Sequence, residues 1–303
     1  MPSRRHVLFG AAALAAGCAS PRAATPEPDS MITVEGVALH YARLGAGPPV
    51  VLVHGASGNL ADMTFRLGPA LAERHEVIAF DRPGLGLSEL PPGGGVSIGR
   101  QAALMRAALA QMGIERCILV GHSYGGSVAL AWAVEAPDTV QGLLLISAPS
   151  QVWEGGLGLT TDLLANPVTG PLLAQGVGHL APRGLVERAV AGVFKPQAVP
   201  PGYVDHLDPD ILVRPEALRE NARQLNALKD ELRPLIPRYP DLPMPVELVH
   251  GEADTTVGLA IHSAKLVRQI PQARLTALPG VGHMPHQVAT ETVLEAFGRL
   301  GTA

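Results

Sequence analysis

The sequence predicts an α/β fold: a mostly parallel β-sheet covered by helices on both faces, with a helical segment inserted between two strands. The run at 50–53 is apolar throughout and the run at 140–147 is mostly apolar, as expected for buried strands. These runs alternate with helix-like segments, which is typical of a parallel sheet. The alternation stops at Ala148-Pro149 and resumes at Val246, and the residues between are helix-like and rich in proline and glycine.

The predicted elements follow one another in a regular order along the chain. Strands are expected at 32–34, 38–44, 50–53, 76–80, 117–120, 140–147, 246–249 and 274–278. Helices are expected at 63–73, 98–112, 127–136, 257–270 and 290–300. Ser97 is a good N-cap for the second of these helices, in which Ile98, Ala102 and Met105 recur at steps of four and three residues.

The most informative stretch is Gly121-His122-Ser123-Tyr124-Gly125-Gly126, which joins an apolar strand to a helix-like run. A serine at the apex of such a sharp turn is held with its hydroxyl exposed above the end of the sheet. Gly121 and Gly125 suit the turn because Cβ atoms on either side of the serine would collide, and Gly126 lets the helix approach the sheet. The pattern indicates covalent catalysis by Ser123. A glycine-rich turn capped by serine is the alternative that only its context excludes.

A nucleophilic serine needs a base, and the base needs an orienting acid. His283 lies in a glycine-containing loop after the last strand, and Asp254 follows the strand at 246–249. We therefore predict the chain order Ser123, Asp254, His283. The rival acid is Glu252, and the rival histidine is His286, which is expected to be an ordinary loop residue.

At this point the sequence resembles the α/β-hydrolase family, in which nucleophile, acid and base follow in the same order. The resemblance rests on four ordered motifs, which are His54-Gly55, Asp81-Arg82-Pro83-Gly84-Leu85-Gly86-Leu87-Ser88, the serine turn and Gly282-His283. It covers roughly residues 31–300 and is strongest for esterase, perhydrolase and C–C hydrolase members with a single cap. It implies a doubly wound, eight-stranded-type sheet formed by 31–149 and 241–303, with 150–240 as the helical cap.

The resemblance also implies a role for each site residue. Ser123 would attack a carbonyl, His283 would move its proton, and Asp254 would fix the tautomer of His283. The backbone N–H groups of Ala56 and Tyr124 would bind the oxyanion. Trp153, at the start of the cap, is a candidate for the acyl pocket, although ordinary cap packing explains it equally well. We expect Asp81 to tie loops together, and His54 and His122 to brace the site.

Three functions remain open, and all use a small-molecule ligand. The first is hydrolysis of an ester or related acyl substrate. The second is perhydrolysis, amide cleavage or C–C bond hydrolysis by the same residues, and the third is ligand binding on a hydrolase scaffold. The formal net charge of −4 gives no reason to expect a nucleic-acid partner. No Cys/His cluster has zinc spacing, and we expect neither a metal nor an organic cofactor.

The N-terminus predicts a separate segment, 1–30, that serves as export signal and linker. Arg4 and Arg5 precede an apolar run at 7–19, which is too short to cross a bilayer comfortably but suits the core of an export signal. Cys18 follows Ala15-Ala16-Gly17, which resembles a lipoprotein processing site. The expected location is the periplasm or cell envelope, with acylation of Cys18 as an open alternative to ordinary cleavage. Retention in the cytoplasm is the competing interpretation.

Overall fold

The computed structural model describes residues 27–94, 96–180 and 182–301. Residues 1–26 of the predicted export signal and linker (1–30), with Arg4, Arg5 and Cys18, lie outside these residues. The linker prediction is wrong for 27–30, which form the start of the first strand, Glu27–Val34. Among the helices that are described, none is long and apolar enough to cross a membrane.

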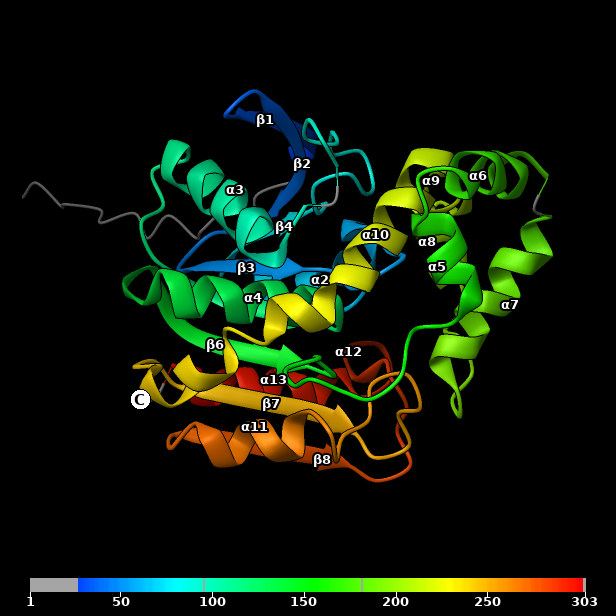
Figure 1. The fold of residues 1–303 in the computed structure, drawn as a ribbon. Helices are drawn as coiled ribbons and strands as arrows, with labels where there is room; N and C mark the ends of the chain where they lie inside the picture. Colours follow the sequence, from blue (N-terminus) through cyan, green and yellow to red (C-terminus); the bar gives the residue numbers. More distant parts are fainter. Residues whose placement is uncertain (1–26, 95, 181, 302–303) are drawn as a thin grey trace, which may run out of the picture.

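The sheet has eight strands, as the sequence predicts (Figure 1). They are β1 (Glu27–Val34), β2 (Val37–Leu44), β3 (Pro49–Val53), β4 (Glu76–Phe80), β5 (Cys117–His122), β6 (Val140–Ile146), β7 (Val246–Gly251) and β8 (Ala273–Leu278). Their spatial order is β1-β2-β4-β3-β5-β6-β7-β8. The pairs β1–β2 and β2–β4 are antiparallel and all the others are parallel, so the mostly parallel sheet is confirmed.

Helices cover both faces of this sheet. One face packs against α3 (Ile98–Gln111), α4 (Tyr124–Glu135) and α11 (Ser263–Gln269), and the other against α1 (Leu60–Thr64), α2 (Leu67–Ala72) and α13 (Thr290–Leu300). The strands β3 and β5 contribute alternate side chains to the two cores, since Val51 and Leu119 face the first layer while Leu52 and Val120 face the second. Both faces of these two strands are therefore apolar where helices cover them.

Three predicted helices differ from the structure in their bounds. The helix expected at 63–73 is divided into α1 and α2, because Pro69 in a continuous helix would remove a hydrogen bond and clash with the preceding turn. The helix after the serine turn begins at Tyr124, three residues earlier than expected. The helix expected from 257 begins only at Ser263, because Asp254 accepts hydrogen bonds from the N–H groups of Thr256 and Val257 and holds that segment as a loop.

Between β6 and β7 the chain leaves the sheet and forms a group of helices, for which we keep the name cap (residues 150–240). They are α5 (Leu159–Ala165), α6 (Thr169–Leu180), α7 (Arg183–Phe194), α8 (Tyr203–His206), α9 (Pro209–Leu212), α10 (Pro215–Leu232) and the 3₁₀ helix η2 (Ile236–Asp241). In Figure 1, α5 to α9 lie beyond the ends of β6 and β7 to which the strand arrows point, and α10 runs back to the sheet. The cap thus lies over the carboxyl edge of the sheet, where open α/β sheets bind their ligands.

Candidate active site

The structure brings together the three residues that the sequence predicts as nucleophile, base and acid. Ser123 follows β5, Asp254 follows β7, and His283 lies in the loop between β8 and the short helix α12 (Pro285–Val288). The Ser123 hydroxyl lies 2.9 Å from Nε2 of His283, and Nδ1 of His283 lies 2.7 Å from Oδ2 of Asp254. All three side chains are buried. The rival acid Glu252 is exposed.

Ser123 occupies the strained position that the sequence predicts at the apex of the turn. Its backbone has φ 50° and ψ −125°, a region that costs a non-glycine residue on the order of 1–3 kcal/mol. A Cβ atom at Gly121 would collide with the backbone of Gly125, as expected across a tight turn. The reason for Gly125 is different from the predicted one, since a Cβ atom there would collide with the carbonyls of Val53 and His54 at the end of β3. The turn is therefore packed against the neighbouring strand as well as against itself.

Asp254 and His283 have the protonation states that proton transfer from a serine requires. Burial alone would raise the pKa of Asp254, but hydrogen bonds from His250 and His283 outweigh it and hold that pKa below its usual range. Burial lowers the pKa of His283, and its hydrogen bond to Asp254 opposes this only in part. A neutral imidazole that donates from Nδ1 to a carboxylate presents its free Nε2 lone pair to the Ser123 hydroxyl.

The two predicted oxyanion donors lie beside Ser123 in the same cavity. Tyr124 is the first residue of α4, and the first N–H groups of a helix have no partner within it. The N–H of Ala56 belongs to the Gly55–Ala56 peptide, whose carbonyl accepts from Nδ1 of His54 (2.8 Å) and from the Arg82 guanidinium (3.1 Å). Because the C=O and N–H of a trans peptide point in opposite directions, these two bonds hold the Ala56 N–H away from Arg82.

Arg82 is fully buried and is a positioning group that the sequence analysis did not single out. Its guanidinium donates to the side-chain oxygens of Gln101 (3.1 Å) and Gln224 (2.6 Å) and lies 4.2 Å from the ring centroid of Tyr124. The neighbouring Asp81 ties loops together as predicted, because it accepts from the N–H groups of Leu60 and Leu87 and from His40. The loop after β4, helix α3 and the cap helix α10 are thereby linked to the predicted oxyanion peptide.

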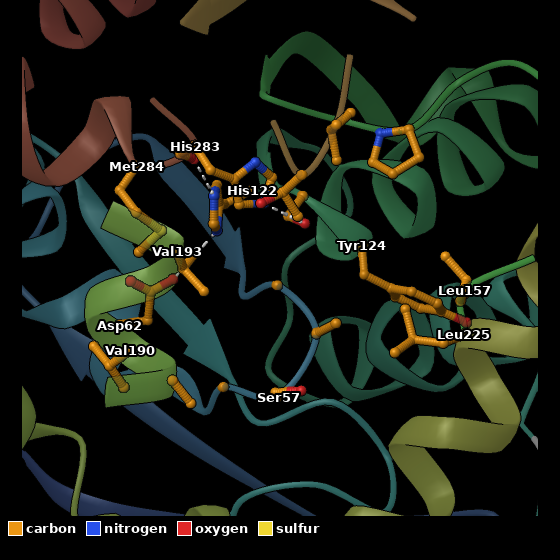
Figure 2. A pocket seen from close by; sticks show the side chains of 18 of the residues that line it. Ser57, Asp62, His122, Tyr124, Leu157, Val190, Val193, Leu225, His283 and Met284 are labelled. Atoms are coloured by element: carbon orange, nitrogen blue, oxygen red, sulfur yellow. Dashed lines mark hydrogen bonds and ion pairs between the residues drawn. The ribbon is translucent and has the colours of Figure 1, made fainter. Parts of the chain in front are cut away.

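A cavity of about 820 Å³ lies above Ser123, within the range that is typical of small-molecule sites. In Figure 2, Val190 and Val193 of α7 approach it from one side, and Leu157 and Leu225 lie on the other. Trp153 lines the cavity and also packs edge-on against His262, with ring centroids 5.9 Å apart. Apart from the residues around Ser123, the walls are largely aliphatic.

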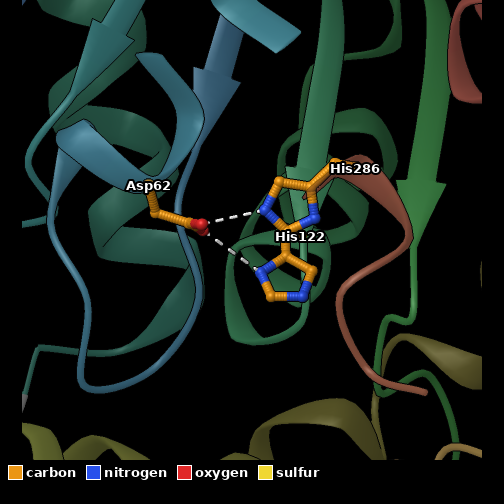
Figure 3. A group of neighbouring side chains, drawn as sticks. All are labelled: Asp62, His122 and His286. Atoms are coloured by element: carbon orange, nitrogen blue, oxygen red, sulfur yellow. Dashed lines mark hydrogen bonds and ion pairs between the residues drawn. The ribbon is translucent and has the colours of Figure 1, made fainter. Parts of the chain in front are cut away.

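Asp62, His122 and His286 form a second buried group (Figure 3). It lies next to the first, since the ring centroids of His122 and His283 are 5.0 Å apart. Oδ1 of Asp62 accepts from Nε2 of His286 (2.9 Å), and Oδ2 lies 3.4 Å from Nδ1 of His122. His122 in turn donates from Nε2 to the backbone carbonyl of His283 (3.0 Å), so it braces the site as predicted. The prediction for His286 is wrong, because it is a fully buried residue of α12 and not an ordinary loop histidine.

This second group is the set of His and carboxylate side chains among the described residues whose spacing suits a metal ion. Its carboxylate already has other partners. The Tyr203 hydroxyl donates to Oδ1 of Asp62 (2.7 Å), and the Gln287 amide donates to the same oxygen (3.0 Å) and to the Asp62 carbonyl (2.6 Å). A metal ion would have to compete with these donors, so the arrangement favours a hydrogen-bonded cluster. We use the name Asp62 cluster for five residues: Asp62, His122, Tyr203, His286 and Gln287.

Sequence reasoning missed several residues of the site for an identifiable reason. Asp62 and Tyr203 lie in segments without a recognisable motif, and 141 positions separate them. His250 gave a usable signal, since a polar residue at the end of a buried parallel strand faces the edge where the other site residues gather. It lies 3.2 Å from Oδ2 of Asp254.

Comparison with known proteins agrees with this geometry. The profile of the alpha/beta hydrolase family matches residues 50–296. Uncharacterized protein Rv2715 of Mycobacterium tuberculosis is 28% identical over 84% of this chain and 75% of its own length. Two solved structures share the fold. The 2-hydroxy-6-oxo-6-phenylhexa-2,4-dienoate hydrolase of Rhodococcus sp. strain RHA1 has a TM-score of 0.75 and 23% identity, and covers 92% of this chain and 100% of that one. The enol-lactonase of Burkholderia xenovorans LB400 has a TM-score of 0.72 and 19% identity, and the match covers 90% of this chain and 100% of the lactonase chain. With a profile match across both halves of the sheet, the chain belongs to the alpha/beta hydrolase family.

Proposed function

We propose that the protein is a serine hydrolase that cleaves an ester or related acyl substrate through an acyl-enzyme on Ser123. The observation that carries the proposal is the unbroken path from the Ser123 hydroxyl to Nε2 of His283 (2.9 Å) and from Nδ1 to Asp254 (2.7 Å). A serine, a neutral imidazole and an ionised carboxylate in this order are what general-base activation of a hydroxyl requires.

The reaction follows from these contacts. His283 removes the proton from the Ser123 hydroxyl as the oxygen attacks the substrate carbonyl, and the resulting oxyanion is bound by the N–H groups of Ala56 and Tyr124. His283 then gives the proton to the leaving alcohol, which departs and leaves the acyl group on Ser123. A water molecule, activated by the same imidazole, releases the acid and restores the serine. Asp254 stabilises the imidazolium formed in each step.

Replacement of the serine tests the proposal directly. Ser123→Ala should lower kcat for p-nitrophenyl butyrate by at least ~10³-fold, since such residues act as a unit. A fluorophosphonate probe should label the folded wild-type protein, and peptide mass spectrometry should find the adduct on Ser123. Full turnover by Ser123→Ala would overturn the proposal. Failure of the probe to react with folded protein would favour a ligand-binding function on the same scaffold.

Other acyl chemistry by the same residues is a second candidate. The fold is shared with proteins named as a dienoate hydrolase and an enol-lactonase. Ester hydrolysis requires only the groups described above, so we propose it first. Measurement of peracid formation and of diketone cleavage beside ester hydrolysis separates the possibilities, and stronger turnover in either assay would favour the second candidate.

We further propose that the chain is exported to the periplasm or cell envelope. Support comes from the sequence of 1–30, with Arg4, Arg5 and an apolar run that ends near Cys18. Cell fractionation of the wild type and of Cys18→Ser tests both parts. Export should be kept in the variant, whereas loss of membrane association would indicate acylation of Cys18. Wild-type protein found only in the cytoplasm would contradict export.

A further inference from the structure

Helix α6 of the cap is built with its large apolar side chains facing outward. Its buried residues are Gly170 and Ala174, and a Cβ atom at Gly170 would collide with the carbonyl of Leu164, so small residues let α6 pack closely on α5. By contrast, Leu172 is 79% exposed and Leu180 is 81% exposed. These leucines contribute little to the packing of the cap, and water surrounds them in the isolated protein. Such an arrangement indicates a surface that is covered by something else.

The outward leucines belong to a continuous stretch with almost no charge. Between positions 155 and 182, Asp162 is the one residue with a charged side chain. The exposed large apolar residues of this stretch, which we call the apolar patch, are Leu157, Leu159, Val168, Leu172, Leu173, Val177 and Leu180. Protein–protein interfaces usually have a polar rim, often with arginine. An uncharged patch of aliphatic side chains instead complements hydrocarbon, because no charge has to lose its water when the two meet.

The apolar patch is continuous with the wall of the cavity above Ser123. Leu157 and Val177 are exposed at the surface and also line the cavity. From there α7 presents one apolar face to the cavity, through Leu185, Val186, Ala189, Val190, Val193 and Phe194. These residues span about 13 Å along the helix axis at the usual rise of an α-helix. Phe194 ends this face in a small core with Met284, the residue after His283.

We propose that the apolar patch docks on the surface of a lipid aggregate and that the natural substrate is a long-chain acyl ester taken from that aggregate. The acyl chain would enter between Leu157 and Val177 and lie along α7, which brings its carbonyl to Ser123. This proposal deepens the proposed hydrolase function and rests on it. A protein partner seated on the same patch would block entry to the cavity. A lipid surface would instead deliver the acyl ester that the cavity is proposed to bind.

Vesicle binding by an inactive protein tests the docking surface independently of catalysis. Ser123→Ala protein should float with phosphatidylcholine vesicles. The further substitutions Leu172→Glu and Leu180→Glu should weaken this binding roughly tenfold or more, because two exposed leucines would no longer be buried in lipid. Neither leucine lines the cavity. Met31→Glu is the matched control, since Met31 is 51% exposed on β1, away from the cap, and it should leave binding unchanged.

Substrate choice tests the second half of the proposal in protein with an intact Ser123. The Leu172→Glu, Leu180→Glu protein should lose roughly tenfold or more in kcat/KM for p-nitrophenyl decanoate in neutral micelles. It should keep its rate on dissolved p-nitrophenyl butyrate, which also proves that it is folded. Absence of vesicle binding by Ser123→Ala, or equal binding by the glutamate variant, would overturn the proposal. So would a dimer that the same glutamates dissociate, because a second copy would then cover the patch. Unchanged hydrolysis by Ser123→Ala would instead overturn the proposed function while leaving vesicle binding to be judged separately.

Discussion

The site contains two buried Asp–His pairs that differ in what surrounds them. In one, Asp254 accepts a hydrogen bond from Nδ1 of His283, and Nε2 of the same ring is hydrogen-bonded to the Ser123 hydroxyl. In the other, Asp62 accepts a hydrogen bond from Nε2 of His286, and Nδ1 of His286 is buried without a hydrogen-bond partner. The first pair ends at a reactive hydroxyl, while the second ends at a buried ring nitrogen, although Asp62 itself also lines the cavity. An Asp–His pair is therefore not by itself a sign of catalysis.

The donors around the two carboxylates make the same distinction. Asp254 accepts from two imidazoles and from backbone N–H groups of its own loop, which orient it toward His283. Asp62 accepts from His286, from Tyr203 of the cap and from Gln287 of α12, so it joins three separate segments. Burial would raise the pKa of Asp62, but His286 and His122 outweigh it and hold that pKa well below its usual range. We interpret the Asp62 cluster as a structural joint beneath the cap.

The largest difference between the pairs should appear when each carboxylate loses its charge. Asp254→Asn should lower kcat by ~10³–10⁴-fold, because the amide can hold His283 in the wrong tautomer and cannot stabilise the imidazolium. Steady-state kinetics on p-nitrophenyl butyrate measures this. Glu252→Gln, an exposed neighbour, is the matched control and should leave kcat unchanged. Equal losses in the two variants would remove the distinction on which the assignment of Asp254 depends.

The corresponding change in the second pair should act on stability. Asp62→Asn should lower the free energy of unfolding by about 3 kcal/mol. The buried hydrogen-bond donors around position 62 would then face a neutral amide instead of a carboxylate. Urea unfolding followed by tryptophan fluorescence gives this value, with the exposed Asp241→Asn as control. We expect kcat/KM to fall less than roughly tenfold, about 1.4 kcal/mol. A loss of activity as large as that of Asp254→Asn, in protein that remains fully folded, would place Asp62 in the reaction instead.

A smaller effect should follow when the cap loses its bond to the cluster. Tyr203→Phe removes only the hydroxyl that lies 2.7 Å from Oδ1 of Asp62. Because His286 and Gln287 still donate to this oxygen, the expected loss is about 1.5 kcal/mol, as for one hydrogen bond to a charged group. Urea unfolding of the single variant and of the double variant with Asp62→Asn forms a double-mutant cycle. Strict additivity would contradict a joint between Tyr203 and Asp62.

The mildest test changes pH and no residue. The proposed reaction needs neutral His283, and burial lowers the pKa of this imidazole below its ordinary value of 6.5. The value of kcat/KM should therefore rise with pH through a midpoint below 6.5 and then level off. Asp62→Asn should leave this midpoint nearly unchanged, since it does not touch His283. A midpoint clearly above 6.5 in the wild type would contradict the protonation state assigned to the site.

How much could be predicted from the sequence depends on how local the signal is. The strands at 50–53 and 140–147 were predictable because strands covered by helices on both faces are mostly apolar. Ser123 was predictable because its turn requires glycine at particular neighbours. The division of the helix at 63–73 was missed, although Pro69 lies in the middle of that stretch and disfavours a continuous helix. The burial of His286 was missed because its partner Asp62 lies 224 positions away.

The sequence by itself determined the parallel sheet and the sharp turn at Ser123, because each depends on residue type over a short span. Its ordered motifs also predicted Ser123, Asp254 and His283 as nucleophile, acid and base. Only the tertiary structure decided that the rival His286 is enclosed and paired with Asp62, since that depends on where separate segments meet above the sheet. It also decided that the leucines of α6 face outward. The spacing of apolar residues along α6 does not show which side of the helix is buried. In the structure the small residues Gly170 and Ala174 are buried, and Gly170 packs against α5.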